Sequence, residues 1–136
     1  MATFANLSIS DSVPTSRTFT AMENSGGTSV WTYIPSGMAS LGGRSIKLRI
    51  TRGKTPQDRY KVEIKISVPL VDAPATAAGA YTPAPKVVET TELTMIFFMS
   101  NRASQLDRDD LVAFAANLLA VSGVKDAISK GIGITG

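Results

Sequence analysis

The sequence contains no cysteine and no histidine. The absence of cysteine excludes disulfide bridges, thiolate zinc sites and cysteine nucleophiles. The absence of histidine removes the side chain that most often serves as a general base or a metal ligand. An enzyme built on carboxylates or lysine is the weakest of the functions considered, so no enzymatic activity is expected. Neither a cofactor nor a metal ion is predicted.

Long hydrophobic runs are also missing. The longest apolar stretches, "LTMIFFM" and "LVAFAANLLAV", fall short of the ~20 residues that a membrane helix needs. The first ten residues, "MATFANLSIS", have neither a basic segment nor an apolar core, so no signal peptide is expected. A chain of 136 residues that is 43% hydrophobic predicts one folded domain in the cytosol, without a membrane partner or a small-molecule substrate.

Positive charge is concentrated in one part of the chain. Residues 44–67 hold eight of the 14 lysines and arginines and only two acids, a net charge of +6, whereas the whole chain carries +3. On both sides of the turn "GKTPQD", apolar residues alternate with polar ones, which predicts two half-buried strands paired as an antiparallel hairpin. Such a hairpin would place four cations on one face, opposite the aliphatic side chains. We call these four the basic plate: Lys47, Arg49, Lys61 and Lys65.

The basic plate has two interpretations. It could be an ordinary solvated surface. However, a strong excess of like charge opposes folding and assembly unless a polyanion neutralises it, and phosphates do so with release of counterions. The sequence therefore favours contact with a nucleic-acid backbone. Aromatic residues for base stacking are scarce near the plate, where only Tyr60 is close.

Further strand patterns occur at "FANLSIS", "RTFTAME", "SVWTYI" and "VVETTELTMIFFM". Trp31 and Tyr33 share one face of the third pattern, which favours a packing role. Residues 71–86 are rich in alanine, proline and glycine and predict a long loop of the kind that often carries function. Strands first and helices last predict an α+β fold.

After residue 101 the apolar spacing becomes helical. The apolar face of this helix consists of Leu111, Phe114, Ala115, Leu118 and Leu119. Gly123 is expected to end the helix, and "VKDAIS" predicts a short second helix. One helix ~10 Å across covers less than half of a five-stranded sheet ~20–25 Å wide. A second copy of the chain is expected to cover the remainder, which predicts an obligate dimer with these five residues at its interface.

Two groups of acids have a chemical and a structural interpretation. Asp107, Asp109 and Asp110 could bind a divalent ion, but three carboxylates in the first turn of a helix favour capping. Glu63 and Glu92 could act as an acid and base pair on the sheet, but spacers among the cations are favoured.

Three segments, "DRYKVEIKISVPLV", "ELTMIFFMSN" and "RDDLVAFAANLLAVSG" followed by "VKDAI", resemble in their order and spacing the coat proteins of the leviviruses, the small single-stranded RNA bacteriophages. The resemblance implies a single coat-protein domain over residues 1–136. It implies an N-terminal β-hairpin (1–27), a five-stranded antiparallel sheet (28–100) with the long loop 71–86, and two C-terminal helices with a tail (104–136). It also implies an intertwined dimer with a continuous ten-stranded sheet, in which each subunit's helices lie across its partner.

The resemblance further implies a function. Dimers of such proteins build an icosahedral shell, typically T=3, with the sheet facing the packaged RNA. The dimer also binds an RNA hairpin at the replicase start and represses its translation. The protein would then be a virion component assembled in the cytoplasm of the bacterial host. An alternative that the residues leave open is a cytosolic RNA-binding regulator dimer that never forms shells.

The RNA-facing positions implied by the resemblance lie on three strands. They are Ser45, Lys47, Arg49 and Thr51 on the first, Lys61, Glu63, Lys65 and Ser67 on the second, and Val88, Thr90 and Glu92 on the third. Well-known members have hydroxyl side chains that shape adenine pockets where Lys47, Arg49 and Glu63 stand here, and a base-stacking aromatic where Val88 stands. The expectation of RNA packaging is therefore firmer than the expectation of any particular hairpin.

Overall fold

The computed structural model describes residues 3–35, 42–55, 57–72 and 86–133. Apart from residues 71, 72 and 86, the predicted loop 71–86 lies outside the described residues. The elements are β1 (Leu7–Ser10), β2 (Ser16–Ser25), β3 (Thr28–Tyr33), β4 (Arg44–Thr51), β5 (Tyr60–Asp72), β6 (Lys86–Met99), α1 (Gln105–Ala120) and α2 (Ser122–Lys130). The chain divides into a sheet unit, Met1–Arg52 with Tyr60–Phe98, and a helical unit, Gly53–Arg59 with Met99–Gly136.

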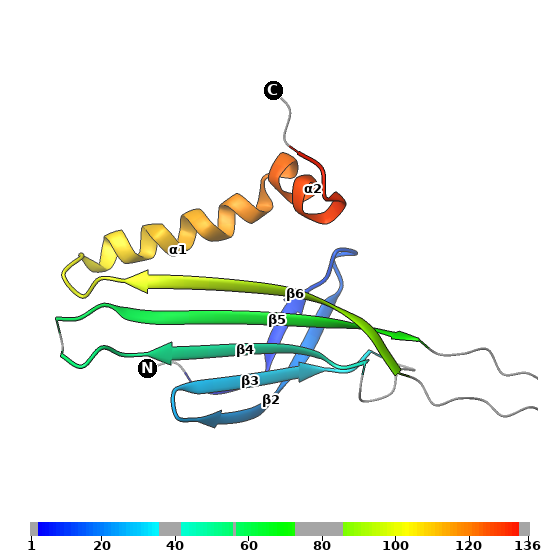
Figure 1. The fold of residues 1–136 in the computed structure, drawn as a ribbon, viewed down its shortest axis with the longest axis horizontal. Helices are drawn as coiled ribbons and strands as arrows, with labels where there is room; N and C mark the ends of the chain where they lie inside the picture. The colour runs from blue at the N-terminus through cyan, green and yellow to red at the C-terminus, as the bar shows by residue number, and fades with distance from the viewer. Residues whose placement is uncertain (1–2, 36–41, 56, 73–85, 134–136) are drawn as a thin grey trace, which may run out of the picture. The chain divides into compact units, whose positions relative to one another are not determined.

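The strands form one antiparallel meander in which the order across the sheet equals the order along the chain (Figure 1). The predicted α+β class, the antiparallel sheet and the two C-terminal helices are confirmed. The sheet has six strands rather than five because β2 has two partners. Its first residues pair with β1, from Ser16 to Phe19, and its later residues pair with β3, from Thr20 to Ser25. A register shift between Ala21 and Glu23 marks a bulge in β2.

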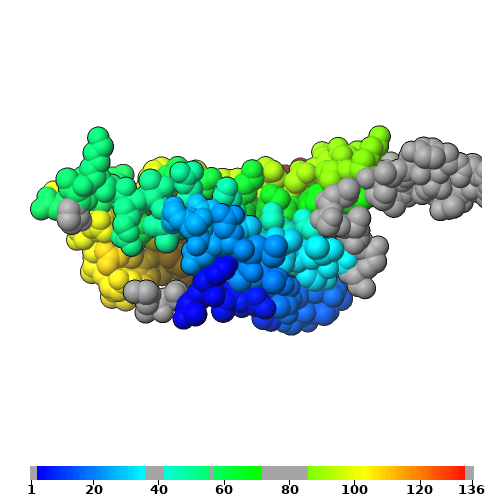
Figure 2. Space-filling view, turned by 90° about the horizontal axis from the view of Figure 1, so that it is seen from below, coloured from blue at the N-terminus to red at the C-terminus, as the bar shows by residue number. Residues whose placement is uncertain are grey.

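The core of the sheet unit lies on the apolar face of β3 and β4, under the N-terminal residues. Phe19, Trp31 and Ile46 are buried together, and the partly buried residues packed against them are Phe4, Leu7, Ala21, Tyr33, Leu48 and Ile66. The indole Nε1 of Trp31 donates a 2.8 Å hydrogen bond to the carbonyl oxygen of Ala5, which ties the segment before β1 to β3. Figure 2 shows this segment and β1, in blue, gathered on one side of the later strands. The predicted packing role of Trp31 and Tyr33 is confirmed.

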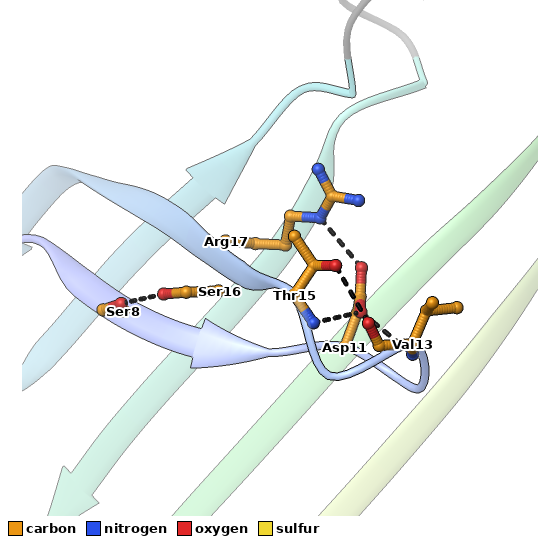
Figure 3. A network of polar contacts seen from close by, with 6 residues as sticks. All are labelled: Ser8, Asp11, Val13, Thr15, Ser16 and Arg17. Carbon is orange, nitrogen blue, oxygen red and sulfur yellow. Dashed lines mark hydrogen bonds and ion pairs between the residues drawn. The ribbon is translucent and has the colours of Figure 1, made fainter.

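A polar network closes the β1–β2 hairpin at Asp11 (Figure 3). Arg17 Nε donates to one carboxylate oxygen at 2.8 Å, and the N–H groups of Val13 and Thr15 each donate to the other at 3.0 Å. The hydrogen bond from Arg17, followed by that from Thr15, lowers the pKa of Asp11. The guanidinium of Arg17 also lies 5.9 Å from the centre of the Tyr33 ring, so the network holds the hairpin tip beside β3.

The β2–β3 turn consists of two glycines in the left-handed region, Gly26 with φ 58° and Gly27 with φ 77°. Ser25 and Thr28 are register partners on either side of them, so the turn is a two-residue hairpin loop of the kind that needs positive φ at both positions. A Cβ on Gly27 would lie 2.8 Å from the carbonyl oxygen of Ile50, whereas a Cβ on Gly26 would meet nothing within 4 Å.

We expect Gly27→Ala to destabilise the protein more than Gly26→Ala. Both substitutions incur about 1–2 kcal/mol for placing an L-residue in the left-handed region, and the first adds a clash that costs roughly 1–3 kcal/mol more. The measurement is denaturant unfolding of both variants at one protein concentration. Equal losses for the two variants would show that the turn does not press against Ile50.

In the helical unit, α1 begins one residue after Ser104, which is its N-cap. The Ser104 hydroxyl oxygen accepts a 3.1 Å hydrogen bond from the N–H of Asp107. Of the three predicted capping acids only Asp107 lies in the first turn, and Asp109 instead accepts from Gln105 Nε2 at 2.8 Å. The placement of all three acids in that turn was wrong because a serine, and not an aspartate, starts the helix.

The prediction that Gly123 ends the first helix is also wrong. Extended backbone at Val121 ends α1 and begins α2, and Gly123 lies inside α2. The glycine that caps a helix is Gly131, which follows α2 with φ 64°. Among the described residues no single helix is long and apolar enough to cross a membrane; α1 and α2 would reach that length only together, and the chain bends by 67° between them.

Candidate nucleic-acid interface

The pairing of β4 with β5 creates the face that carries the basic plate. Ile46 lies opposite Ile66 and Leu48 opposite Ile64, so the aliphatic side chains of both strands point toward the core side. The alternate positions point to the other face, as the period of two predicted. Their register pairs are Ser45–Ser67, Lys47–Lys65, Arg49–Glu63 and Thr51–Lys61. All eight residues predicted on these two strands therefore lie on one face.

The register places Lys47 directly opposite Lys65. Directly opposite side chains in a sheet have Cβ atoms about 4.5–5.5 Å apart, and like charges at that separation are destabilising. Lys47, Arg49, Glu63 and Lys65 line a hollow of about 170 Å³. Three cations and one acid thus surround a space that can admit an anionic group.

Each of the two acidic residues on this face forms an ion pair with a lysine. Lys61 Nζ lies 3.5 Å from a carboxylate oxygen of Glu63, and Lys65 Nζ lies 3.5 Å from one of Glu92. All four side chains are a third to a half exposed, and ion pairs of this kind contribute only about 0–1 kcal/mol. Glu63 and Glu92 therefore serve as partners of the cations, which favours the spacer interpretation. A phosphate could compete for both lysines at low cost.

Lys47 and Arg49 differ from the other two cations. Both are exposed, and within the described ranges neither has a carboxylate within 4.0 Å. The basic plate with Glu63 and Glu92 carries four positive and two negative charges, a net +2 for each chain. The uncompensated charge is located on β4.

The three predicted positions on β6 lie in the next strand of the sheet. The contact between Lys65 and Glu92 places Glu92 on the face of the basic plate, and the alternation along β6 places Val88 and Thr90 there as well. All three side chains are exposed. The structure therefore brings all eleven sequence-predicted RNA positions to one face of β4, β5 and β6.

One strand of this face was missed by the sequence reasoning. On β3, Thr28, Val30 and Thr32 are the register partners of Arg49, Lys47 and Ser45, so they extend the same face. The signal was present in "TSVWTY", where these residues alternate with the packed aromatics. It was overlooked because only the aromatic half of the pattern was used.

The other four cations of residues 44–67 lie elsewhere. Arg44 is the register partner of Tyr33 and helps to line a hollow of about 140 Å³ with Asp11 and Arg17 on the core side. The guanidinium of Arg52 stacks over the Tyr60 ring at 5.8 Å. Lys54 and Arg59 belong to the turn between β4 and β5. The net charge of +6 over residues 44–67 is therefore larger than the charge that lies on this face.

The predicted dimer positions lie on α1, and they are unburied in the single chain. Phe114 is 69% exposed and Leu118 is 55% exposed. Leu111 and Leu119 are also exposed, and Ala115 is of intermediate exposure. Of the side chains described on α1, none is buried. A small sheet protein with one cationic face and an unburied apolar helix is the form expected of a subunit that assembles with further copies.

Comparison with known proteins agrees with a subunit that assembles with further copies. The family model described as "Levivirus coat protein" matches residues 2–134. The chain belongs to the levivirus coat protein family. It is a capsid protein, and its place is in the shell of the virion.

Solved structures show the same fold. The virus-like particle of bacteriophage NT-214 is 26% identical, with 96% of this chain and 98% of that chain covered and a TM-score of 0.82. The virus-like particle of bacteriophage ESE058 is 19% identical, covering 98% and 100%, with a TM-score of 0.84. The bacteriophage GA protein capsid is 17% identical, covering 97% and 98%, with a TM-score of 0.76. No curated protein sequence matches the chain.

Proposed function

We propose that this capsid protein acts as a homodimer, that its dimers assemble into an icosahedral shell around single-stranded genomic RNA, and that the dimer represses replicase translation by binding an RNA stem-loop. The role is structural, without catalysis. The observation that carries the RNA-binding part is the direct opposition of Lys47 and Lys65 beside Arg49, around one hollow. Two directly opposed lysines destabilise the folded chain, so stability alone does not explain them. A phosphate bound between them would be attracted by both positive charges.

The residues of this face fall into two groups that would contact different parts of the RNA. The cations of the basic plate are suited to phosphate contacts, which position RNA without reading its sequence. Thr90, Glu92 and Glu63 offer hydroxyl and carboxylate groups that can read base edges. Val88 lacks the flat ring that stacks well on a base. We therefore expect strong binding of RNA in general and a stem-loop specificity that depends on hydroxyl and carboxylate groups.

The dimer is supported by the apolar surface that the single chain leaves in water. Beyond the five predicted positions, the exposed apolar residues of the helical unit include Leu106, Val112, Val121 and Ile128. A monomeric protein rarely leaves so many apolar side chains of one unit in water, because burying apolar surface is favourable by about 25 cal/mol per Å². A second copy presenting the same surface around a two-fold axis would cover both at once.

The test is expression of the chain alone in bacteria, followed by size-exclusion chromatography, electron microscopy and measurement of nucleic acid in the particle fraction. We expect closed particles that contain RNA and dissociate to dimers. A dimer that binds RNA but never forms particles would favour the cytosolic regulator. Repression is tested separately, by titrating the dimer with the replicase-start stem-loop and with a scrambled stem-loop. Equal affinity for the two RNAs would refute specific repression and leave packaging intact.

A further inference from the structure

A row of hydroxyl side chains crosses the sheet beside the basic plate. Thr32 on β3 is the register partner of Ser45 on β4, and Ser45 is the partner of Ser67 on β5. On its other side Thr32 pairs with Thr20 on β2, the next strand of the sheet (Figure 1). Directly opposite side chains point to the same face of a sheet. The face that carries the basic plate therefore continues across β3 onto β2.

At its β2 end this row reaches a hollow of about 380 Å³. The residues that line the hollow are Thr18, Thr20, Met22, Thr32, Tyr33 and Ile34. None of these six side chains is charged at neutral pH, whereas the hollow of the basic plate is lined by three cations and one acid. A hollow without cations is poorly suited to a phosphate and well suited to an uncharged group with polar edges.

The bulge in β2 lies at this hollow. The register shift between Ala21 and Glu23 leaves Met22 without a partner on β3, and the side chain of Met22 is 64% exposed. Bulges re-aim side chains and are common next to functional sites. Methionine is flexible and polarisable, so it adapts to ligands of irregular shape. Met22 and Ile34 thus supply apolar contacts beside the threonines.

The three threonines have hydroxyl groups that a ligand can use. Thr18 and Thr20 are exposed, and Thr32 is partly exposed. Within the described part of the chain, none of these three hydroxyls takes part in a hydrogen bond. A hydroxyl both donates and accepts, so it can bond to the donor or the acceptor groups on the edge of a base.

We propose that this hollow binds an unpaired base of single-stranded RNA while a phosphate of the same strand lies on the basic plate. The inference rests on the proposed RNA binding and adds to it a base site on β2 and β3. Proteins bind single strands by combining a cationic track for the backbone with a separate surface for the bases. The basic plate supplies the track, and the uncharged hollow supplies the surface.

The distance between the two sites suits one RNA strand. Lys47 is the register partner of Val30, which lies two residues before Thr32 on β3. With about 4.8 Å between strands and a rise of about 3.4 Å per residue, the Cα atoms of Lys47 and Thr32 are about 8 Å apart. A strand whose phosphate contacts Lys47 can therefore place a nearby base in the hollow.

The test compares two double variants at the same positions. Thr20→Val with Thr32→Val removes both hydroxyls and keeps branched side chains that suit a strand. Thr20→Ser with Thr32→Ser keeps both hydroxyls. The affinity of the valine variant for a short unstructured RNA, measured by filter binding, should fall about tenfold because two hydrogen bonds to the base are lost. The serine variant should stay within about threefold of the parent protein, because its hydroxyls can still bond to the base.

The salt dependence distinguishes a base from a phosphate in the hollow. The valine variant should keep the slope of log K against log salt that the parent protein has, because it loses no phosphate contact. Circular dichroism of both variants checks that the sheet is folded.

A second measurement uses the parent chain and does not depend on any variant. The protein is bound to an RNA that contains photoreactive thiouridine and is irradiated, and the cross-linked peptides are mapped by mass spectrometry. Because the photoreactive group is on the base, we expect cross-links to residues 18–22 and 32–34.

The outcomes separate the base site from RNA binding itself. A folded valine variant with the affinity of the parent protein, or one with a flattened salt slope, would overturn the base site and leave the basic plate as the RNA contact. The absence of cross-links to both segments would overturn it as well, also where the valine variant does not fold. A parent chain that binds no RNA would instead refute the proposed function.

Discussion

Neutralising the basic plate should flatten the salt dependence of RNA binding by roughly 3 units of log K per log salt, since each phosphate contact contributes about 0.7–0.9. The variant replaces Lys47, Arg49, Lys61 and Lys65 with glutamine, which keeps a polar, unbranched side chain at each position and removes its charge. Between about 50 and 200 mM salt, the affinity of the parent protein should fall roughly 60-fold more than that of the variant. Filter binding to an unstructured RNA at several salt concentrations measures the slope.

Stability of the same variant gives an independent readout. The aliphatic side of β4 and β5 is untouched, and the repulsion between Lys47 and Lys65 is removed. The variant also removes the two weak ion pairs of Lys61 and Lys65. Thermal unfolding at low salt should therefore stay close to that of the parent protein, while particles form less efficiently or contain less RNA. A charge-matched control replaces four exposed cations outside the plate, namely Lys54, Arg102, Lys125 and Lys130. If this control flattened the slope as much as the plate variant does, the plate would be only a solvated surface.

Leu118→Asp should abolish the soluble protein. In the single chain Leu118 is 55% exposed, and a surface substitution of that kind usually changes stability by less than about 0.5 kcal/mol. At a dimer interface the same carboxylate would be buried without a partner, which costs several kcal/mol unless it becomes protonated or stays hydrated. We therefore expect an insoluble or unfolded chain, assessed by the soluble fraction, by circular dichroism and by size-exclusion chromatography.

The matched control for that substitution is Asn117→Asp, which introduces the same charge at the adjacent exposed position of α1. It should leave folding and dimerisation intact, because its side chain points about 100° away around the helix. A soluble, well-folded Leu118→Asp monomer would contradict the idea that the two copies share a core. Such a result would assign the exposed apolar residues of α1 to contacts made later, during shell assembly.

Several parts of the fold could be predicted because local patterns determine them. The alternation in residues 45–51 and 61–67 fixed both strands and the face of every residue, and the register Ile46–Ile66 confirms it. The opposition of Lys47 and Lys65 could not be predicted, because register also depends on the geometry of the intervening turn. The sequence showed that the two lysines share a face and could not show that they are direct neighbours.

The ends of the helices were predicted less well. Gly123 was expected to stop the first helix because glycine is common at helix ends. The actual break is Val121, whose N–H bonds to the carbonyl oxygen of Leu118 while its extended backbone starts α2. A valine gives no sequence signal for such a break. The pairing of β2 with both β1 and β3 was not predicted either. Alternation alone does not distinguish an uninterrupted ten-residue strand from one that contains a bulge.

The identical order of the strands in the chain and in the sheet has a consequence for how the protein is made. Every strand pairs with its predecessor, so each hairpin can close as soon as the ribosome releases it, and the entropy cost of loop closure stays low. The helices α1 and α2 follow all six strands in the chain and are synthesised after them. Most of the sheet can therefore be folded before the surfaces that we assign to the partner emerge, which shortens the time in which these surfaces could aggregate.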